Sequence, residues 1–187
     1  MTEPILLVLS GPNLNLLGER EPDVYGDATL ADHVDVARQA ASEHGMAVEH
    51  VQSNHEGELV DAIQGARGRC GALLINPGAF THYAWAIHDA LASFDGPILE
   101  VHLSNPAARE PWRHTSVVAP VAAGSIAGFG GDGYRMAVKA IARRLNRGSL
   151  TGYPRWRWPG GWTDYGPAWT PRLAMPWSSH RRPTSAT

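Results

Sequence analysis

The strongest constraint on the fold is an alternation of short apolar runs with longer amphipathic patterns, repeated up to about residue 145. The apolar runs have the length of strands and lie at 5–9, 46–51, 72–75, 97–101 and within 116–130. Patterns with helical periodicity lie between or after them, at 29–45, 53–68 and 133–145, and we expect 76–94 to be a glycine-containing turn that runs into a helix. Strands that alternate with helices form βαβ units, whose right-handed crossovers give a parallel sheet with helices on both faces. The sequence therefore predicts an α/β fold with a flavodoxin-like, doubly wound five-stranded parallel sheet.

Two of the helical patterns carry details that a structure can test. Thr29 is followed three residues later by Asp32, a spacing typical of a capping box at the start of a helix. In the second pattern, we expect Leu59, Ile63 and Ala66 to face the core because they recur at helical spacing.

Composition places the chain among ordinary globular proteins. It has 187 residues, 43% of them hydrophobic and 18% charged, which suffices for one domain with a full core. The net charge of -2 argues against nucleic acid as the main partner. The apolar runs are too short to span a membrane, and the N-terminal residues lack the basic region of a signal peptide. We therefore expect a cytoplasmic location and no membrane partner.

The segment 10–26 is too long for an ordinary connection between a strand and a helix. Glycine and proline interrupt it, and we expect neither helix nor strand there. Its apolar side chains argue for docking on the body of the protein, and they are Leu14, Leu16, Leu17, Val24 and Tyr25. A phenol acts as a base only where a cation stabilises the phenolate, and Arg20 lies five residues before Tyr25. The alternative interpretation is a solvated Arg20 and a Tyr25 that anchors the loop.

Polar side chains follow three of the predicted strands at their carboxyl ends, where doubly wound sheets bind ligands. They are Asn13, Arg20 and Tyr25 after the first strand, Asn76, Gly78 and His82 after the third, and His102, Ser104, Asn105, Arg109 and Arg113 after the fourth. These groups bind anions, donate hydrogen bonds and move protons. The sequence therefore predicts a site at this edge of the sheet.

Several chemistries are disfavoured by the residues present. Lys139 is the sole lysine among sixteen basic residues and lies in the last helical pattern, where we expect a solvated surface charge. Imine chemistry on a carbonyl substrate needs a lysine in the site. Cys70 is the only cysteine and stands at a helix-to-strand junction without a nearby base. The histidines at 33, 44, 50, 88 and 114 show no metal-ligand spacing with each other, so we do not expect a zinc site.

Four separated motifs resemble those of the type II 3-dehydroquinases and occur in that family's order. They are GPNLNLLGEREPDVYG at 11–26, QSNHEGEL at 52–59, INPGAFTH at 75–82 and EVHLSN at 100–105, followed by Arg109 and Arg113. The resemblance covers about residues 5–145. It implies the conversion of 3-dehydroquinate to 3-dehydroshikimate by trans elimination of water through an enolate, in the shikimate or quinate pathway. Both a biosynthetic and a catabolic role are compatible with these residues.

The resemblance also implies roles for individual residues in this chemistry, which needs a base, an enolate stabiliser and a general acid. Tyr25 is the base and Arg20 activates it, while Asn13 stabilises the enolate through an ordered water. The resemblance implies that no metal, imine or cofactor is needed. His102 is the general acid, and Glu100, two residues earlier on the same strand face, orients its imidazole. For Glu100, a purely structural role at the core edge is the alternative.

Substrate binding is implied for further positions. Asn76, His82 and Arg113 resemble contacts to ring hydroxyls, and Leu103 and Ser104 resemble donors to the substrate carboxylate. Asp89 resembles a residue lent by a neighbouring subunit, which implies a homo-oligomer, a dodecamer built as a tetramer of trimers. Arg109 resembles a support of the site, with an ion pair to Glu110 as the alternative. We interpret His55, at the entry to the second helix, as structural.

Three departures from the family pattern concern subunit contacts and ring specificity. His88 stands where the family has arginine, and Trp85 is bulkier than expected in that helix. Pro111 and Trp112 replace a more polar pair beside Arg113. If His88 weakens the subunit interface, assembly stops at the trimer.

The composition changes abruptly at the C-terminal end. Residues 148–187 hold five tryptophans among six prolines and five arginines, without helical or alternating periodicity. We therefore divide the chain into a catalytic domain at 1–147 and an irregular extension at 148–187. The extension either lies across the catalytic domain or a partner subunit, or has little function.

Two other functions remain open from the sequence alone. The same side chains would accept an amino-substituted 3-dehydroquinate, because the ring hydroxyl contacts barely involve the altered position. A flavodoxin-like protein that binds a nucleotide or a phosphorylated ligand is the alternative from another class. Against it, the first loop lacks both a Ser/Thr-rich phosphate turn and a glycine-lysine phosphate loop.

Overall fold

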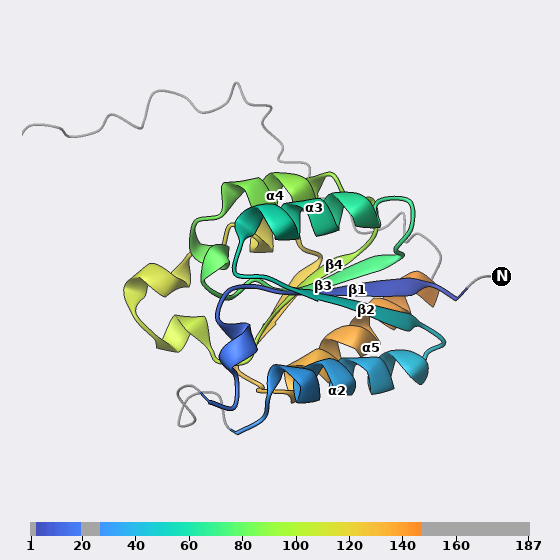
Figure 1. The fold of residues 1–187 in the computed structure, drawn as a ribbon, viewed down its shortest axis with the longest axis horizontal. Coiled ribbons are helices and arrows are strands. Elements are labelled where there is room, and N and C mark those ends of the chain that lie inside the picture. Colours follow the sequence, from blue (N-terminus) through green and yellow to red (C-terminus); the bar gives the residue numbers. More distant parts are fainter. Residues whose placement is uncertain (1–2, 20–26, 147–187) are drawn as a thin grey trace, which may run out of the picture. The chain divides into compact units, whose positions relative to one another are not determined.

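The computed structural model describes residues 3–19 and 27–146, which form a sheet between two layers of helices (Figure 1). In this part of the chain the sheet has five strands in the order β2-β1-β3-β4-β5, and each neighbouring pair is parallel. The strands are β1 Ile5–Ser10, β2 Ala47–Gln52, β3 Ala72–Asn76, β4 Ile98–His102 and β5 Gly124–Ala127. The predicted doubly wound, flavodoxin-like parallel sheet is confirmed.

Helices cover both faces of the sheet. Helices α3 (Glu56–Ala66) and α4 (Trp85–Ala92) pack side by side on one face, and α2 (Leu30–Ser42) and α5 (Asp132–Asn146) pack on the other (Figure 1). Short 3-10 helices occupy the connections, at Leu14–Leu16, Gly78–His82, Pro106–Ala108, Pro111–His114 and Ala119–Val121. Within residues 3–19 and 27–146, no helix has both the length and the apolar character needed to cross a membrane.

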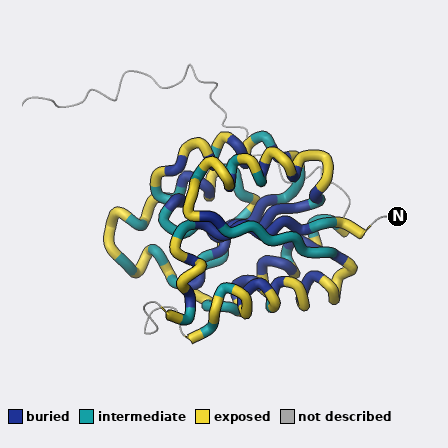
Figure 2. Tube along the Cα trace, viewed as in Figure 1, coloured by how far each residue is buried: buried dark blue, intermediate teal, exposed yellow. Residues whose placement is uncertain are grey.

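The core lies in two layers, one on each side of the sheet, because successive strand residues point to opposite faces. In β1, Leu6 and Val8 belong to the layer under α2 and α5, whereas Leu7 and Leu9 belong to the layer under α3 and α4. All four are at most 1% exposed. In Figure 2 the buried residues follow the strands and the inner sides of the helices, and the outer sides are exposed.

The two predicted helix details are confirmed. The Thr29 hydroxyl accepts a hydrogen bond from the Asp32 N–H at 3.3 Å, and the Thr29 N–H donates to Asp32 Oδ2 at 2.8 Å. These two bonds form the capping box that begins α2. Leu59, Ile63 and Ala66 are each 0% exposed on the inner side of α3.

The prediction for 76–94, a glycine-containing turn that runs into a helix, is confirmed, and the turn itself is helical. Residues Gly78–His82 form a 3-10 helix, and α4 begins only at Trp85. The Thr81 carbonyl, which a continuous α-helix would offer to the Trp85 N–H, instead accepts from the Val117 N–H at 2.7 Å. A contact from a distant segment therefore ends the first helical turn, which a sequence pattern does not show.

The loop after β1 also differs from the prediction that it holds no regular structure, because Leu14–Leu16 forms a 3-10 turn. Leu14 and Leu17 dock on the core, with 8% and 6% exposure. Leu16 does not, since it is 38% exposed. Val24 and Tyr25 lie outside the described residues.

Strand β1 has β2 on one side and β3 on the other, so the direction in which successive strands join the sheet reverses there. At the carboxyl end of these strands, the Gly11 N–H donates to the Asn76 carbonyl at 2.8 Å. A Cβ at position 11 would lie 2.1 Å from the carbonyl oxygen of Pro77, so only glycine allows this approach. The loops after β1 and β3 are thereby held together where doubly wound sheets bind ligands.

Candidate active site

A cavity of about 140 Å³ opens at the carboxyl edge of the sheet. Its walls come from the loops after β1, β3 and β4, as expected for a site at a topological switch point. The predicted site residues that line it are Asn13, Asn76, His82, His102, Leu103, Ser104, Arg109 and Arg113. The fold therefore gathers residues from three separate motifs around one cavity.

Four other predicted residues have different positions. Glu100 lies behind His102 and is 1% exposed. Asp89 is exposed on α4 and is not one of the described residues that line the cavity of its own chain. Arg20 and Tyr25 lie outside the described residues.

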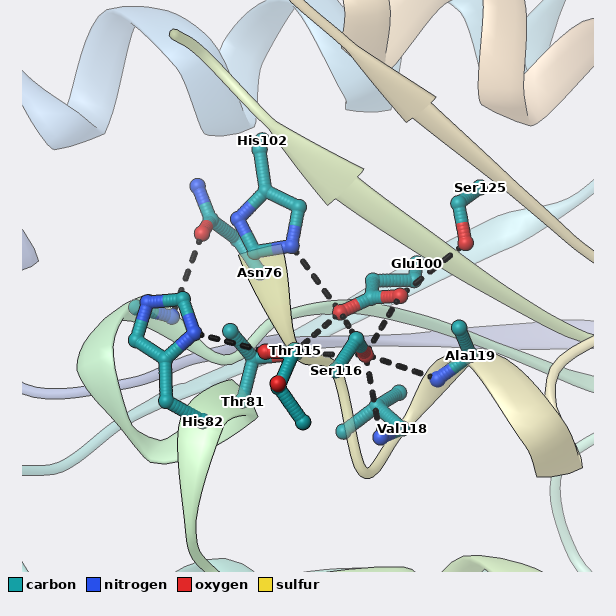
Figure 3. A network of polar contacts seen from close by, with 11 residues as sticks. Asn76, Thr81, His82, Glu100, His102, Thr115, Ser116, Val118, Ala119 and Ser125 are labelled. Carbon is teal, nitrogen blue, oxygen red and sulfur yellow. Dashed lines mark hydrogen bonds and ion pairs between the residues drawn. The ribbon is translucent and has the colours of Figure 1, made fainter. Parts of the chain in front are cut away.

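Glu100 receives hydrogen bonds from every side (Figure 3). Thr81 Oγ1 donates to its Oε1 at 2.5 Å, Ser125 Oγ donates to its Oε2 at 3.0 Å, and Ser116 Oγ lies 3.0 and 3.1 Å from the two oxygens. Burial acts to raise the pKa of the Glu100 carboxyl, but hydrogen bonds from His102, Thr81 and Ser125 and the charge of His102 outweigh it. The pKa falls below its ordinary value, so the buried carboxylate is ionised.

His102 ends β4, and its Nε2 lies 2.9 Å from Glu100 Oε1. An ionised carboxylate only accepts hydrogen bonds, so Nε2 carries a hydrogen and donates it. The second ring nitrogen, Nδ1, is left for a ligand in the cavity that His102 lines. In the imidazolium form, Nδ1 carries a proton that it can give away, while Glu100 stabilises the charge on the ring.

His82 is fixed in a comparable way, by a backbone carbonyl. Its Nδ1 lies 2.8 Å from the Thr115 oxygen, which only accepts, so Nδ1 donates and Nε2 is the ring nitrogen left for a ligand. The next residue, Ser116, bonds Glu100, so one short segment positions both side chains (Figure 3). The Ser116 hydroxyl is itself held by the N–H groups of Val118 and Ala119, at 3.1 and 2.8 Å.

Asn13 has a left-handed backbone, with φ at 63°, which asparagine tolerates better than most residues. Its N–H donates to Asn54 Oδ1 at 2.9 Å. Gln52 Nε2 donates to the Gly11 carbonyl at 3.4 Å and to Asn54 Oδ1 at 3.3 Å. The second sequence motif therefore fixes the loop that carries Asn13. His55, by contrast, is an exposed residue at the start of α3, and the Ser53 hydroxyl accepts its N–H at 2.8 Å.

Two guanidinium groups lie at the mouth of the cavity. Glu110 Oε2 accepts from Arg113 Nε at 2.7 Å and lies 3.7 Å from Arg109 Nε. The Arg113 guanidinium carbon also lies 4.0 Å from the centre of the Trp112 ring, which meets the His82 ring edge to face at 5.2 Å. Arg109 thus lines the cavity and also has the predicted ion pair to Glu110. Two cations beside hydrogen-bond donors suit a ligand with a carboxylate and hydroxyl groups.

The residues that sequence reasoning missed are those that hold the others. Thr81, Ser116 and Ser125 bond Glu100, Tyr134 bonds Asn76 at 3.1 Å, and Asn54 bonds Asn13. Asn54 and Thr81 had a usable signal, since they stand inside the motifs at 52–59 and 75–82, whereas Ser125 lies beside Glu100 only through the register of β4 and β5.

The departures in α4 concern residues away from the cavity mouth. His88 Nδ1 bonds the Val117 carbonyl at 2.7 Å, and Trp85 contacts the His88 ring while 63% exposed. Cys70 is buried at the junction before β3, where burial raises the pKa of its thiol. Lys139 is exposed on α5, as expected. Across residues 3–19 and 27–146, no three His, Cys, Asp or Glu side chains cluster in a way that would hold a metal ion.

Known proteins show the same combination of sequence and fold. The model of a family described as dehydroquinase class II matches residues 4–142. The chain is 53% identical over 143 residues to 3-dehydroquinate dehydratase 2 of Pseudomonas putida, which covers 76% of this chain and 96% of that protein. It is 54% identical over 136 residues to the catabolic 3-dehydroquinase of Penicillium rubens, which covers 73% of this chain and 88% of that protein.

Among solved structures, the chain is similar to the type II dehydroquinase from Propionibacterium acnes. The TM-score is 0.72 with 42% identity, over 76% of this chain and 98% of that chain. The similarity therefore covers at least 88% of the length of each of these three proteins. The part of this chain that the family model does not match includes its C-terminal end.

Proposed function

Because the chain belongs to the class II dehydroquinase family, we propose that its cavity dehydrates 3-dehydroquinate to 3-dehydroshikimate. The enzyme is then a hydro-lyase of the shikimate and quinate pathways. The observation that carries the proposal is the pair of Glu100 and His102, in which a buried carboxylate fixes an imidazole at the cavity wall. A proton donor held in this way suits a reaction that expels hydroxide as water.

The proposed reaction has two proton transfers. A base first takes the hydrogen alpha to the ketone, and its C–H electron pair forms an enolate. The enolate then collapses to a carbon-carbon double bond as the beta C–O bond breaks, and a general acid protonates the departing oxygen to give water. In this scheme Tyr25 is the base with Arg20 as the cation that stabilises its phenolate, and Asn13 stabilises the enolate through water.

His102 is the general acid in this scheme, and the geometry supports Nδ1 as the atom that gives the proton. Nε2 is committed to Glu100, while the ring as a whole lines the cavity. Glu100 does not accept this proton, because its hydrogen bonds favour the ionised carboxylate. Its role is to orient the ring and to stabilise the imidazolium before transfer.

The remaining cavity residues bind the substrate. Asn76, His82 and Arg113 contact ring hydroxyls, and the Leu103 backbone and the Ser104 hydroxyl hold the carboxylate. Support comes from their joint position on one cavity and from the two guanidinium groups at its mouth. The reaction as written consumes no redox equivalents and needs no cofactor.

The assembly is a homododecamer, a tetramer of trimers in the cytoplasm, in which Asp89 completes a neighbour's site. Support comes from the exposure of Asp89 on α4 beside the exposed aromatic residues Tyr83 and Trp85, which are 58% and 63% exposed. Closed symmetry would make each such contact recur around the trimer. Residues 1–147 form the catalytic domain, and 148–187 are an extension to it.

The experiment is a direct assay of enone absorbance after addition of 3-dehydroquinate, with light scattering at the same concentration. Tyr25→Phe removes the phenolate and keeps the ring, so turnover should fall by about 10²–10⁴-fold with little change in thermal stability. Lack of any enone signal from the parent protein would refute the activity. Near-normal turnover in Tyr25→Phe would refute the base, and a fully active monomer would refute the role of Asp89.

A further inference from the structure

Among the described residues, Tyr134 has the largest fully buried side chain. It reaches toward the candidate active site from outside the cavity. It lies on α5 and is 0% exposed, and its ring stacks on His33 of α2 with 5.7 Å between ring centres. Its hydroxyl reaches the carboxyl end of β3, where Asn76 Nδ2 donates to it at 3.1 Å. A helix on one face of the sheet is therefore bonded directly to a side chain that lines the cavity.

The contacts of Asn76 define which way its amide points. The Gly78 N–H donates to Oδ1 at 3.3 Å, and Nδ2 donates to the Tyr134 oxygen. A flipped amide would place its NH₂ group against the Gly78 N–H, two donors facing each other. With the amide held on both sides, one N–H of Nδ2 and one lone pair of Oδ1 are left for a ligand.

The hydrogen-bond chain continues away from the cavity. Tyr134 also bonds Ser10, which is 0% exposed, and Ser10 Oγ lies 3.1 Å from His50 Nε2. The Tyr134 hydroxyl, with its hydrogen, therefore lies between two side-chain partners, Asn76 and Ser10. Burial raises the pKa of Tyr134 to about 12, so the phenol is neutral and keeps this hydrogen at physiological pH.

We propose that Tyr134 is a positioning residue for substrate binding, which fixes the Asn76 amide so that an N–H donor faces a ring hydroxyl of the substrate. This inference rests on the proposed function, because it assigns Asn76 to a substrate contact. Without the phenol oxygen, the Asn76 amide loses its partner and rotates, and its donor is no longer aimed. The Asn76 N–H that loses its acceptor is then buried and unsatisfied, so the amide gains by turning away from its native orientation.

Tyr134→Phe removes the oxygen and keeps the ring on His33. A contact made equally in the bound substrate and in the transition state appears in KM, so KM for 3-dehydroquinate should rise about five- to tenfold. The value of kcat should stay within about twofold. The matched control is Val138→Ala, one helical turn along α5 and 0% exposed, which truncates the core without touching the chain of polar contacts. It should lower thermal stability and leave KM unchanged.

A double-mutant cycle separates positioning from general destabilisation. If Tyr134 acts through Asn76, adding Tyr134→Phe to Asn76→Ala should raise KM no further. Independent, multiplicative effects on KM would overturn the inference, as would an unchanged KM in Tyr134→Phe or an equal KM rise in Val138→Ala. Dehydration by the parent enzyme is measured in the same series, so failure of the proposed function would be seen separately.

If Tyr134→Phe does not fold, a second variant tests the same series of hydrogen bonds at Ser10. Ser10→Ala removes the second side-chain partner of the Tyr134 hydroxyl, which can then rotate and disturb the orientation of the Asn76 amide. A raised KM with kcat unchanged supports the inference, and an unchanged KM overturns it.

Discussion

Two groups of residues at the cavity each place a glutamate beside a basic side chain that lines it, but they are built differently. We define the floor as Glu100 and His102 with their hydroxyl donors, and the rim as Arg109, Glu110, Trp112 and Arg113. Glu100 is 1% exposed and receives hydroxyl hydrogen bonds from other elements, whereas Glu110 is 53% exposed and bonds only rim arginines among its described side-chain partners.

The difference in burial between the two glutamates decides which of them can support a catalytic step. A buried charge is stable only if fixed partners replace its water, so the floor holds one geometry and is organised before the substrate arrives. The Glu110 carboxylate at the rim keeps much of its water and gains little from any one geometry. We therefore expect changes at the floor to appear in kcat and stability, and changes at the rim to appear in KM.

The largest effect is expected for His102→Ala, which removes the proton donor of the floor. The value of kcat for dehydration should fall by about 10²–10⁴-fold, because loss of hydroxide then lacks acid catalysis. Exchange of the alpha hydrogen with deuterated solvent, followed by NMR, should fall far less, since a different group removes that hydrogen. The control is His44→Ala, at an exposed position after α2. Equal loss of exchange and dehydration would make His102 a binding residue.

The next effect is expected for Glu100→Gln, which keeps the size of the side chain and removes its charge. The value of kcat should fall by about a hundredfold, because the amide neither stabilises the imidazolium nor accepts from all of its donors. The free energy of unfolding at pH 7 should fall by about 1–3 kcal/mol, because buried hydrogen bonds are lost.

The pH dependence of this loss follows from the lowered pKa of Glu100. A carboxyl whose pKa is lower in the folded state stabilises the fold above its ordinary value of 4.5, and that contribution disappears as the pH falls through the folded-state pKa. The stability difference between the parent enzyme and Glu100→Gln should therefore shrink in acid. Unfolding curves from pH 7 down to the acid limit measure it, and a constant difference would contradict the ionised floor.

Arg113→Lys tests the rim with a substitution that keeps the positive charge. Lysine cannot keep both the planar contact with Trp112 and the bond to Glu110, so KM should rise about tenfold while kcat changes little. Arg135→Lys on the exposed side of α5 is the control and should change neither. A fall in kcat as large as that of Glu100→Gln would remove the distinction between floor and rim.

The sequence predicts that Glu100 and His102 lie together at the floor, but not which hydroxyl groups bond Glu100. Glu100 and His102 are two residues apart on a strand, so their side chains share a face, and the apolar runs locate that strand. Thr81 and Ser116 lie on different loops, and their approach to Glu100 depends on a break between Thr81 and α4 that only tertiary contacts produce.

The position of the cavity residues at one edge of the sheet follows from the sequence, but the contacts of their supports do not. Residues such as Asn76 and His82 follow strands directly, so topology alone brings them to one edge. Tyr134 is 58 positions from Asn76 and lies within an amphipathic helix, where an inward tyrosine is an ordinary core residue. Its hydroxyl has a specific partner only because of how α5 packs on the sheet.

The smallest effect is expected for Glu110→Gln, the same substitution as at the floor. The glutamine oxygen still accepts from Arg113, and an exposed ion pair contributes little to stability, so unfolding should not change measurably. Loss of the negative charge leaves two arginines less neutralised at the cavity mouth, which favours a carboxylate substrate. KM should therefore fall, by less than about twofold at low salt, and the difference should vanish near 0.5 M salt, where charges are screened beyond roughly 4 Å. A loss of kcat or of acid stability like that of Glu100→Gln would show that burial is not what separates the two glutamates.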